Sequence, residues 1–205
     1  MAGPHENLEH AEHAEHASHG GNKKIALLIS VLALFLAFSE TLGKGAQTES
    51  IGLNIKASDT WNFFQAKTIR QTTLRASADN LAAIASSIEK PEAKTTLDRQ
   101  IETWRATAAR YESDPKEKDG RKELREQAEH YEHQRDYQLA RYHQFELGSA
   151  AFQIGIVLAS AEVITGMVML GWLSGLVGLV GVAFSALGLW APHALDFLLH
   201  ASGAH

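Results

Sequence analysis

The chain lacks cysteine, has few prolines and carries little net charge. Its 205 residues include no cysteine and four prolines, and the formal net charge is −5 at pH 7. The absence of cysteine excludes a disulfide framework, a thiolate metal site and a cysteine nucleophile. The small negative charge does not indicate a nucleic-acid-binding protein.

The sequence also lacks the usual signatures of an enzyme. It has no glycine loop for phosphate, no nucleophile elbow and no helical His-Glu-x-x-His motif. His130 and His133 lie close together on one expected helix, and His143 follows later. Such a pair binds a metal only with a third ligand, so surface histidines are the favoured interpretation. We therefore expect no catalytic residue, no cofactor and no enzymatic activity.

What the chain does have is a long apolar region toward its C-terminal end. Residues 148–191 contain no lysine or arginine, and only a short segment at residues 171–175 divides them. Each half approaches the roughly 20 apolar residues that cross a bilayer. We expect a membrane hairpin of two transmembrane helices, residues 148–171 and 174–191, followed by a short tail at residues 192–205.

Small residues recur at helical spacing in both halves of this region. The first half carries Ala151, Gly155 and Ala159, with Glu162 continuing the row, and the second half carries Ser174, Gly178, Gly181, Ser185 and Gly188. In lipid, small side chains let helix backbones approach closely, which favours helix association. Glycine is also simply common in membrane helices. We favour a packing role, with the two rows facing each other.

Glu162 is the only acidic residue inside the expected hairpin. Because a charged carboxylate is costly in hydrocarbon, we expect a protonated Glu162 near mid-helix, level with Ser185 and donating a hydrogen bond. The alternative is a proton or cation site. A proton pathway needs several such groups, and the apolar segments contain only one other acidic residue, Glu40, at a helix end. The satisfied polar contact is therefore favoured.

The N-terminal region combines a polar leader with a first apolar helix. Residues 1–22 repeat Glu-His-Ala and contain no core-forming apolar set, which predicts a disordered tail. Residues 23–42 are strongly apolar and lack a convincing cleavage site, which predicts a retained transmembrane helix. Four histidines of the leader are weak candidates for binding zinc, nickel or copper: His10, His13, His16 and His19.

Residues 43–147 form a polar region rich in helix-forming residues. Ser58 or Asp59 is a candidate N-cap for its first helix. Apolar residues then recur in steps of three and four: Leu74, Ala78, Leu81, Ala85 and Ile88; Leu97, Ile101, Trp104, Ala108 and Tyr111; and Leu124, Ala128 and Tyr131, after which Tyr142 and Phe145 keep the same phase across Arg135 and Gln138. This heptad spacing predicts a coiled-coil-like extramembrane domain whose last helix continues into the membrane at Gly148. Because a lone helix pair buries little, we expect partners or further copies.

Two further groups in this region are interpreted as structural. Four aromatic residues recur at helical spacing, which is typical of packing residues rather than of a ligand site: Trp61, Phe63, Phe64 and Tyr111. Acidic neighbours dilute a short basic cluster, which predicts a solvated helix face: Arg121, Lys122 and Arg125.

The order of these parts resembles that of a known family. The most specific stretch is residues 56–71, which reads KASDTWNFFQAKTIRQ, and the hairpin adds residues 153–160, which read QIGIVLAS. Over roughly residues 24–190 the chain is similar to the bacterial membrane-protein family called domain of unknown function 4337. The resemblance implies a first membrane helix, a charged helical middle and a closing hairpin. The family carries no assigned activity and supplies no site residues.

Together these observations predict an all-α membrane protein with three transmembrane helices. Seventeen of the 19 basic residues lie between the first and second apolar segments, so the positive-inside rule favours a cytoplasmic middle domain in a bacterial inner membrane. We expect a non-enzymatic scaffold or accessory subunit that forms a homo-oligomer or joins a larger membrane complex. The alternatives are a small channel or proton-coupled transporter using Glu162, and a metal-handling protein using the histidine-rich leader.

Overall fold

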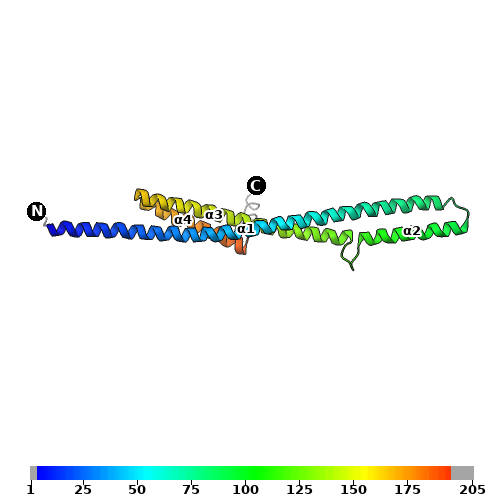
Figure 1. Cartoon of the computed structure of the whole chain (residues 1–205), viewed down its shortest axis with the longest axis horizontal. Coiled ribbons are helices and arrows are strands. Elements are labelled where there is room, and N and C mark those ends of the chain that lie inside the picture. The colour runs from blue at the N-terminus through cyan, green and yellow to red at the C-terminus, as the bar shows by residue number, and fades with distance from the viewer. Residues whose placement is uncertain (1–3, 195–205) are drawn as a thin grey trace, which may run out of the picture. The chain divides into compact units, whose positions relative to one another are not determined.

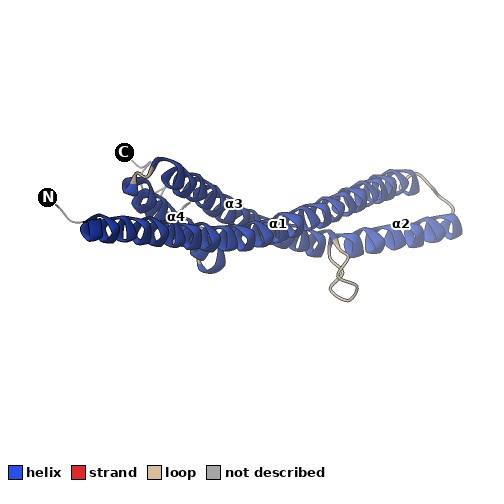
Figure 2. Cartoon of the chain, turned by 60° about the vertical axis from the view of Figure 1, so that its left-hand side comes forward, coloured by secondary structure: helices blue, strands red, loops and turns tan. Residues whose placement is uncertain are grey.

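The described part of the chain is entirely helical in its regular structure. The computed structural model describes the backbone of residues 4–194 and the side chains of residues 23–194. The four helices are α1 (Pro4–Ala85), α2 (Pro91–Glu112), α3 (Arg121–Thr165) and α4 (Val168–Trp190). Figure 2 shows these helices joined by short loops, without a strand in the described residues. The predicted all-α class is confirmed.

The four prolines account for most of the helix boundaries. Pro4 and Pro91 open α1 and α2, where a missing N–H costs nothing, Pro115 lies in the loop before α3, and Pro192 follows α4. No proline lies between Pro4 and Pro91, and α1 runs without a break from Pro4 to Ala85, through Ser58 and Asp59. The predicted helix start at those residues is therefore wrong.

The start of α1 also changes the interpretation of the leader. Residues 1–22 were expected to form a disordered tail, but α1 begins at Pro4 and its backbone continues through this stretch. Alanine and glutamate, which fill the repeat, are strong helix formers, and this local preference accounts for the helical backbone. The leader's side chains, including those of its candidate metal-binding histidines, lie outside the described residues.

The described chain forms two compact units. The polar unit contains residues 50–136, and the apolar unit combines residues up to 49 with those from 137 onward. In the polar unit, α2 runs alongside the C-terminal part of α1 (Figure 1). Ala78, Ala85 and Ile101 form its buried core, with Leu97 and Trp104 packed against them. These residues belong to the predicted heptads, so that spacing located the contact surface correctly.

The apolar unit brings α3 and α4 beside the N-terminal part of α1 (Figure 1). Phe35 of α1 stacks on Phe152 of α3, with ring centroids 5.8 Å apart. An added Cβ at Gly155 or Gly178 would meet the side chain of Leu32, so both glycines pack directly against α1. The hairpin therefore closes on the first apolar helix as well as on itself.

The hairpin turns at Gly166 and Met167, not at the predicted segment 171–175. Gly166 has a φ of +71°, a left-handed conformation that glycine adopts without strain. Residues 171–175 instead continue α4. The predicted boundary between two transmembrane helices at residues 171–174 is consequently wrong by about a turn and a half. The expected continuation of α3 through Gly148 is confirmed.

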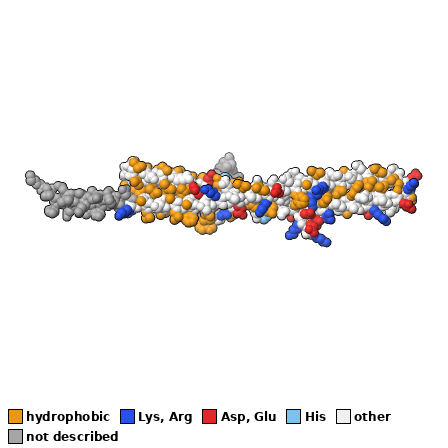
Figure 3. Space-filling view, in the orientation of Figure 1, with side chains coloured by type: hydrophobic (Ala, Val, Ile, Leu, Met, Phe, Trp, Pro, Cys, Tyr) orange, Lys and Arg blue, Asp and Glu red, His pale blue; other side chains and the backbone are white. Residues whose placement is uncertain are grey.

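Polarity is distributed very differently over the two units. Helices α1, α3 and α4 each contain a stretch long and apolar enough to cross a membrane. Figure 3 shows hydrophobic side chains over much of the visible surface of the apolar unit, whereas charged side chains gather on the polar unit. Large apolar side chains such as Leu176, Leu179 and Trp190 are exposed on α4. Outward-facing apolar surface of this extent is unusual for a monomer surrounded by water.

Candidate functional site

The two rows of small residues meet between α3 and α4. The hydroxyl of Ser174 donates a hydrogen bond of 2.7 Å to the carbonyl of Gly155, and a Cβ at Gly181 would collide with the ring of Phe152. Eight of the nine proposed packing residues are buried, and one is half-buried: Ala151, Gly155, Ala159, Glu162, Ser174, Gly178, Gly181 and Gly188, then Ser185. These rows are occupied by contacts inside one chain.

Helix α1 contributes a matching row that the sequence analysis did not single out. Ser39 is 2% exposed and donates a hydrogen bond of 2.9 Å to the carbonyl of Phe145. Its hydroxyl also lies 3.2 Å from that of Ser185 on α4. Leu32, Ser39, Ala46 and Leu53 are all buried and recur every seven residues. That heptad spacing, extended upstream of Leu74, was the signal that would have revealed the row.

The predicted hydrogen bond between Glu162 and Ser185 is not formed. Ser185 donates to the carbonyl of Gly181 at 2.9 Å, and Glu162 lies within the last turn of α3 rather than at mid-helix. Its carboxyl group packs against Gly171, where an added Cβ would collide with it. The earlier turn explains the difference, because it shifts every pairing between the two helices.

One oxygen of the Glu162 carboxyl group is left without a hydrogen-bond partner. The residue is 8% exposed, and its Oε2 atom accepts no hydrogen bond from the described part of the protein. A buried polar atom in this state carries a desolvation cost that no contact offsets. It is therefore a candidate for binding something that donates hydrogen bonds.

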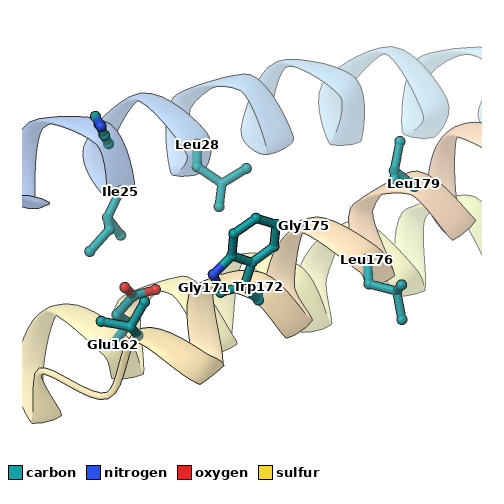
Figure 4. Close-up of a pocket in the computed structure, with 10 residues that line it drawn as sticks. Ile25, Leu28, Glu162, Gly171, Trp172, Gly175, Leu176 and Leu179 are labelled. Carbon is teal, nitrogen blue, oxygen red and sulfur yellow. The ribbon is translucent and has the colours of Figure 1, made fainter.

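A groove of about 590 Å³ opens beside this carboxyl group. Figure 4 shows Glu162 and Ile25 at one end of the groove and Leu176 and Leu179 toward the other. Lys24 of α1 lines the groove next to Ile25, and the ring of Trp172 also lines it. One end therefore carries both signs of charge, whereas the remainder is apolar.

The opposite end of the hairpin is fastened by polar side chains of α3. Arg141 donates through Nε to the carbonyl of Gly188 at 3.2 Å, and Gln144 donates through Nε2 to that of Pro192 at 3.1 Å. The last carbonyls of a helix have no partner within the helix, so these bonds cap the C-terminal end of α4. A cation near this end also interacts favourably with the helix dipole.

In the polar unit, Arg121 is the centre of a network rather than part of a solvated face. Its guanidinium donates to Thr68, Gln71 and Glu112 at 2.8, 2.7 and 3.0 Å. Gln71, which is buried, also donates to the carboxylate of Glu112 at 2.7 Å. That hydrogen bond, with the charges of Arg121 and Arg75, holds the pKa of Glu112 below its ordinary value. The expectation for Arg121 is thus wrong, because the α2–α3 loop turns it toward α1.

The aromatic residues of the polar unit hold cations and polar groups. The ammonium of Lys67 is buried, lies 2.6 Å from Asp119 and sits 5.3 Å from the ring centroids of Phe63 and Tyr111. Trp61 donates through Nε1 to Glu132 at 2.9 Å. Such cation–π and hydrogen-bonded contacts explain how a lysine is buried between helices. Their role in packing agrees with the interpretation of these aromatics.

The described histidines do not assemble into a metal centre. Within residues 23–194, no three His, Cys, Asp or Glu side chains are grouped so as to hold a metal ion. His130 instead lies 3.0 Å from the side-chain nitrogen of Gln134, one helical turn away. His143 lies 3.7 Å from the carboxylate of Glu146.

Fold and composition define a class: an all-helical chain with three helices long and apolar enough to span a membrane, joined to a polar coiled-coil-like unit. Residues 21–191 match the model of the family described as Domain of unknown function (DUF4337). The chain belongs to this family, which confirms the resemblance seen in the sequence. No curated protein matches the chain, and no solved structure does.

Proposed function

We propose that the protein is a non-enzymatic scaffold or accessory subunit anchored in a membrane by α1, α3 and α4. The observation that carries this proposal is the contrast between the two units. The apolar unit exposes large hydrophobic side chains outward, whereas its small and polar residues face inward. That arrangement suits lipid as the surrounding solvent, since close helix contacts in lipid depend on small residues.

The association surface belongs on the polar unit in this proposal. The small-residue rows are already buried within one chain. They therefore do not supply the surface for the self-association that the sequence analysis predicts. The part of α1 in the polar unit instead leaves three large apolar side chains exposed: Ile51, Ile55 and Ile69, at 56%, 56% and 68%. Ile55 and Ile69 are two heptads apart and therefore lie on one helix face.

The orientation follows from the distribution of basic residues. We place residues 50–136 in the cytoplasm of a bacterium, with the turn at Gly166 on the opposite side of the inner membrane. Three crossings are consistent with this assignment. The location of Glu162 near a helix end offers no support for a proton pathway across the membrane.

Introducing charge at the exposed isoleucines tests the scaffold proposal. The double variant I55K/I69K should convert oligomers of the full-length protein into monomers, because the lysines place charge on an apolar contact surface. The mass of the protein in mild detergent, measured by light scattering with size-exclusion chromatography, gives the copy number. The matched control is Gln127→Lys, on α3 of the polar unit, at a position that is already polar and exposed.

Two results would count against this proposal. A wild-type protein that is monomeric and copurifies with no other protein from solubilised membranes would remove the scaffold function. A protein that stays soluble after cell lysis without detergent would remove the membrane anchor itself.

A further inference from the structure

We propose that the groove beside Glu162 binds one phospholipid whose headgroup carries a primary ammonium, with the ammonium on Glu162 and the phosphate at Lys24. This inference rests on the membrane placement proposed above. It begins from the buried and unpartnered Oε2 atom of Glu162. An ammonium supplies both the missing hydrogen-bond donors and the missing positive charge, and such charge-assisted bonds are the stronger kind.

The groove has a charged end and an apolar remainder, as a phospholipid has a charged headgroup and apolar acyl chains. Glu162 packs on Gly171 at the start of α4, and Lys24 lines the groove beside Ile25 near the start of the apolar stretch of α1. From Gly171, α4 continues to Leu179, a rise of about 12 Å along the helix. Figure 4 shows Leu176 and Leu179 extending toward the far end of the groove. An acyl chain fits this apolar length once the headgroup occupies the charged end.

The position of this charged end matches the headgroup region of a bilayer. The turn at Gly166 and the basic pair Lys23 and Lys24 mark the end of the apolar stretches on the same side of the unit. Trp172 lines the groove there, and tryptophan is enriched where hydrocarbon meets water. A lysine at the end of an apolar stretch extends its ammonium toward this region, where it meets phosphate.

The chemistry of the two charged groups selects among phospholipids. A carboxylate accepts hydrogen bonds but cannot donate them, so it favours a headgroup with N–H donors. A quaternary ammonium headgroup lacks these donors, and an anionic glycerol headgroup lacks the positive charge. Phosphatidylethanolamine satisfies both Glu162 and Lys24, whereas phosphatidylcholine and phosphatidylglycerol each satisfy only one of them fully.

Native mass spectrometry of the full-length protein in mild detergent tests the selection directly. The protein is titrated with phosphatidylethanolamine, phosphatidylcholine and phosphatidylglycerol of identical acyl chains, and the retained lipid is counted. We expect retention of one phosphatidylethanolamine, at least about tenfold tighter than phosphatidylcholine, because choline cannot donate hydrogen bonds to the carboxylate. Glu162→Gln should abolish this preference, and Lys24→Gln should weaken the binding of all three lipids.

Two further variants separate the site from the fold. Glu40→Gln removes a carboxylate from the opposite end of the apolar stretch of α1 and should leave the preference unchanged. Gly171→Ala retains the charge of Glu162 but places a Cβ where its carboxyl group lies, so it should reduce the preference. Circular dichroism checks that each variant remains helical.

Equal retention of phosphatidylethanolamine and phosphatidylcholine by the wild-type protein would overturn the inference, and so would a preference that survives in Glu162→Gln. Tighter retention of phosphatidylglycerol would assign the groove to Lys24 alone and would equally overturn it. Each of these results leaves the membrane scaffold intact, since that proposal depends on detergent-dependent solubility and copy number instead. The two proposals therefore fail separately.

Discussion

At the scale of single residues, the informative positions are polar groups removed from water. Arg121, Gln71 and Glu112 form a network in which each partner satisfies another, whereas Glu162 has an oxygen with none. The sequence places Arg121 beside Lys122 and Arg125, a pattern typical of a solvated face. Only the path of the loop before α3 reveals that its guanidinium reaches α1. The Arg121 network stabilises the folded chain. The unpartnered oxygen of Glu162 is instead a candidate for binding a ligand.

The network predicts an acid-dependent stability for the polar unit. Because the folded-state pKa of Glu112 is lowered, its ionised form stabilises the folded protein above the ordinary pKa of 4.5, and this contribution disappears as the pH falls through the lowered pKa. Glu112→Gln should therefore lower the melting temperature at pH 7 by a few degrees and have no effect at the acid end. The effect is small, under about 1 kcal/mol, because Glu112 is half-exposed.

Thermal unfolding followed by circular dichroism measures this dependence. A range from about pH 3 to about pH 7 extends roughly one unit or more on each side of an ordinary glutamate pKa. The exposed Glu126→Gln variant is the matched control, since it removes the same charge from α3, outside the network. A constant difference between Glu112→Gln and wild type across this range would contradict the assignment.

At the scale of helices, the sequence predicted the buried helix faces more accurately than the residues at which helices begin and end. The heptads through Leu97 and Ile101, and the small residues through Gly155 and Gly178, all lie on buried faces. Their spacing alone decides which face is apolar or small. The turn was misplaced because Gly166 and the glycine-containing segment 171–175 both look like turns. The choice depends on how α3 and α4 align with α1, through contacts such as that of Leu32 with Gly178, and no local pattern contains that information.

The packing of α4 predicts a contrast between two of its glycines. An added Cβ at Gly181 meets the ring of Phe152, whereas at Gly175 it meets nothing within 4 Å. Gly181→Ala should destabilise the protein by about 1–3 kcal/mol, the usual range for overpacking. Gly175→Ala should be neutral or slightly stabilising, since alanine is the better helix former. Unfolding in detergent with increasing denaturant measures both, and equal effects would show that α4 does not pack on α3 through this face.

At the scale of the whole molecule, the absence of cysteine provides a clean test of membrane orientation. Met167→Cys places a single thiol in the exposed turn between α3 and α4, and Gln127→Cys places one on the exposed surface of the polar unit. In intact bacterial cells, a membrane-impermeant maleimide should label only Met167→Cys, because three crossings with a cytoplasmic middle leave that turn outside. Gln127→Cys should be labelled only after lysis, and the cysteine-free wild type reports the background. The opposite pattern would reverse the orientation and move the Glu162 groove to the inner leaflet, whereas labelling of both thiols in intact cells would contradict the three crossings. The orientation thus decides which leaflet supplies the lipid, while the charges of Glu162 and Lys24 decide which lipid it is.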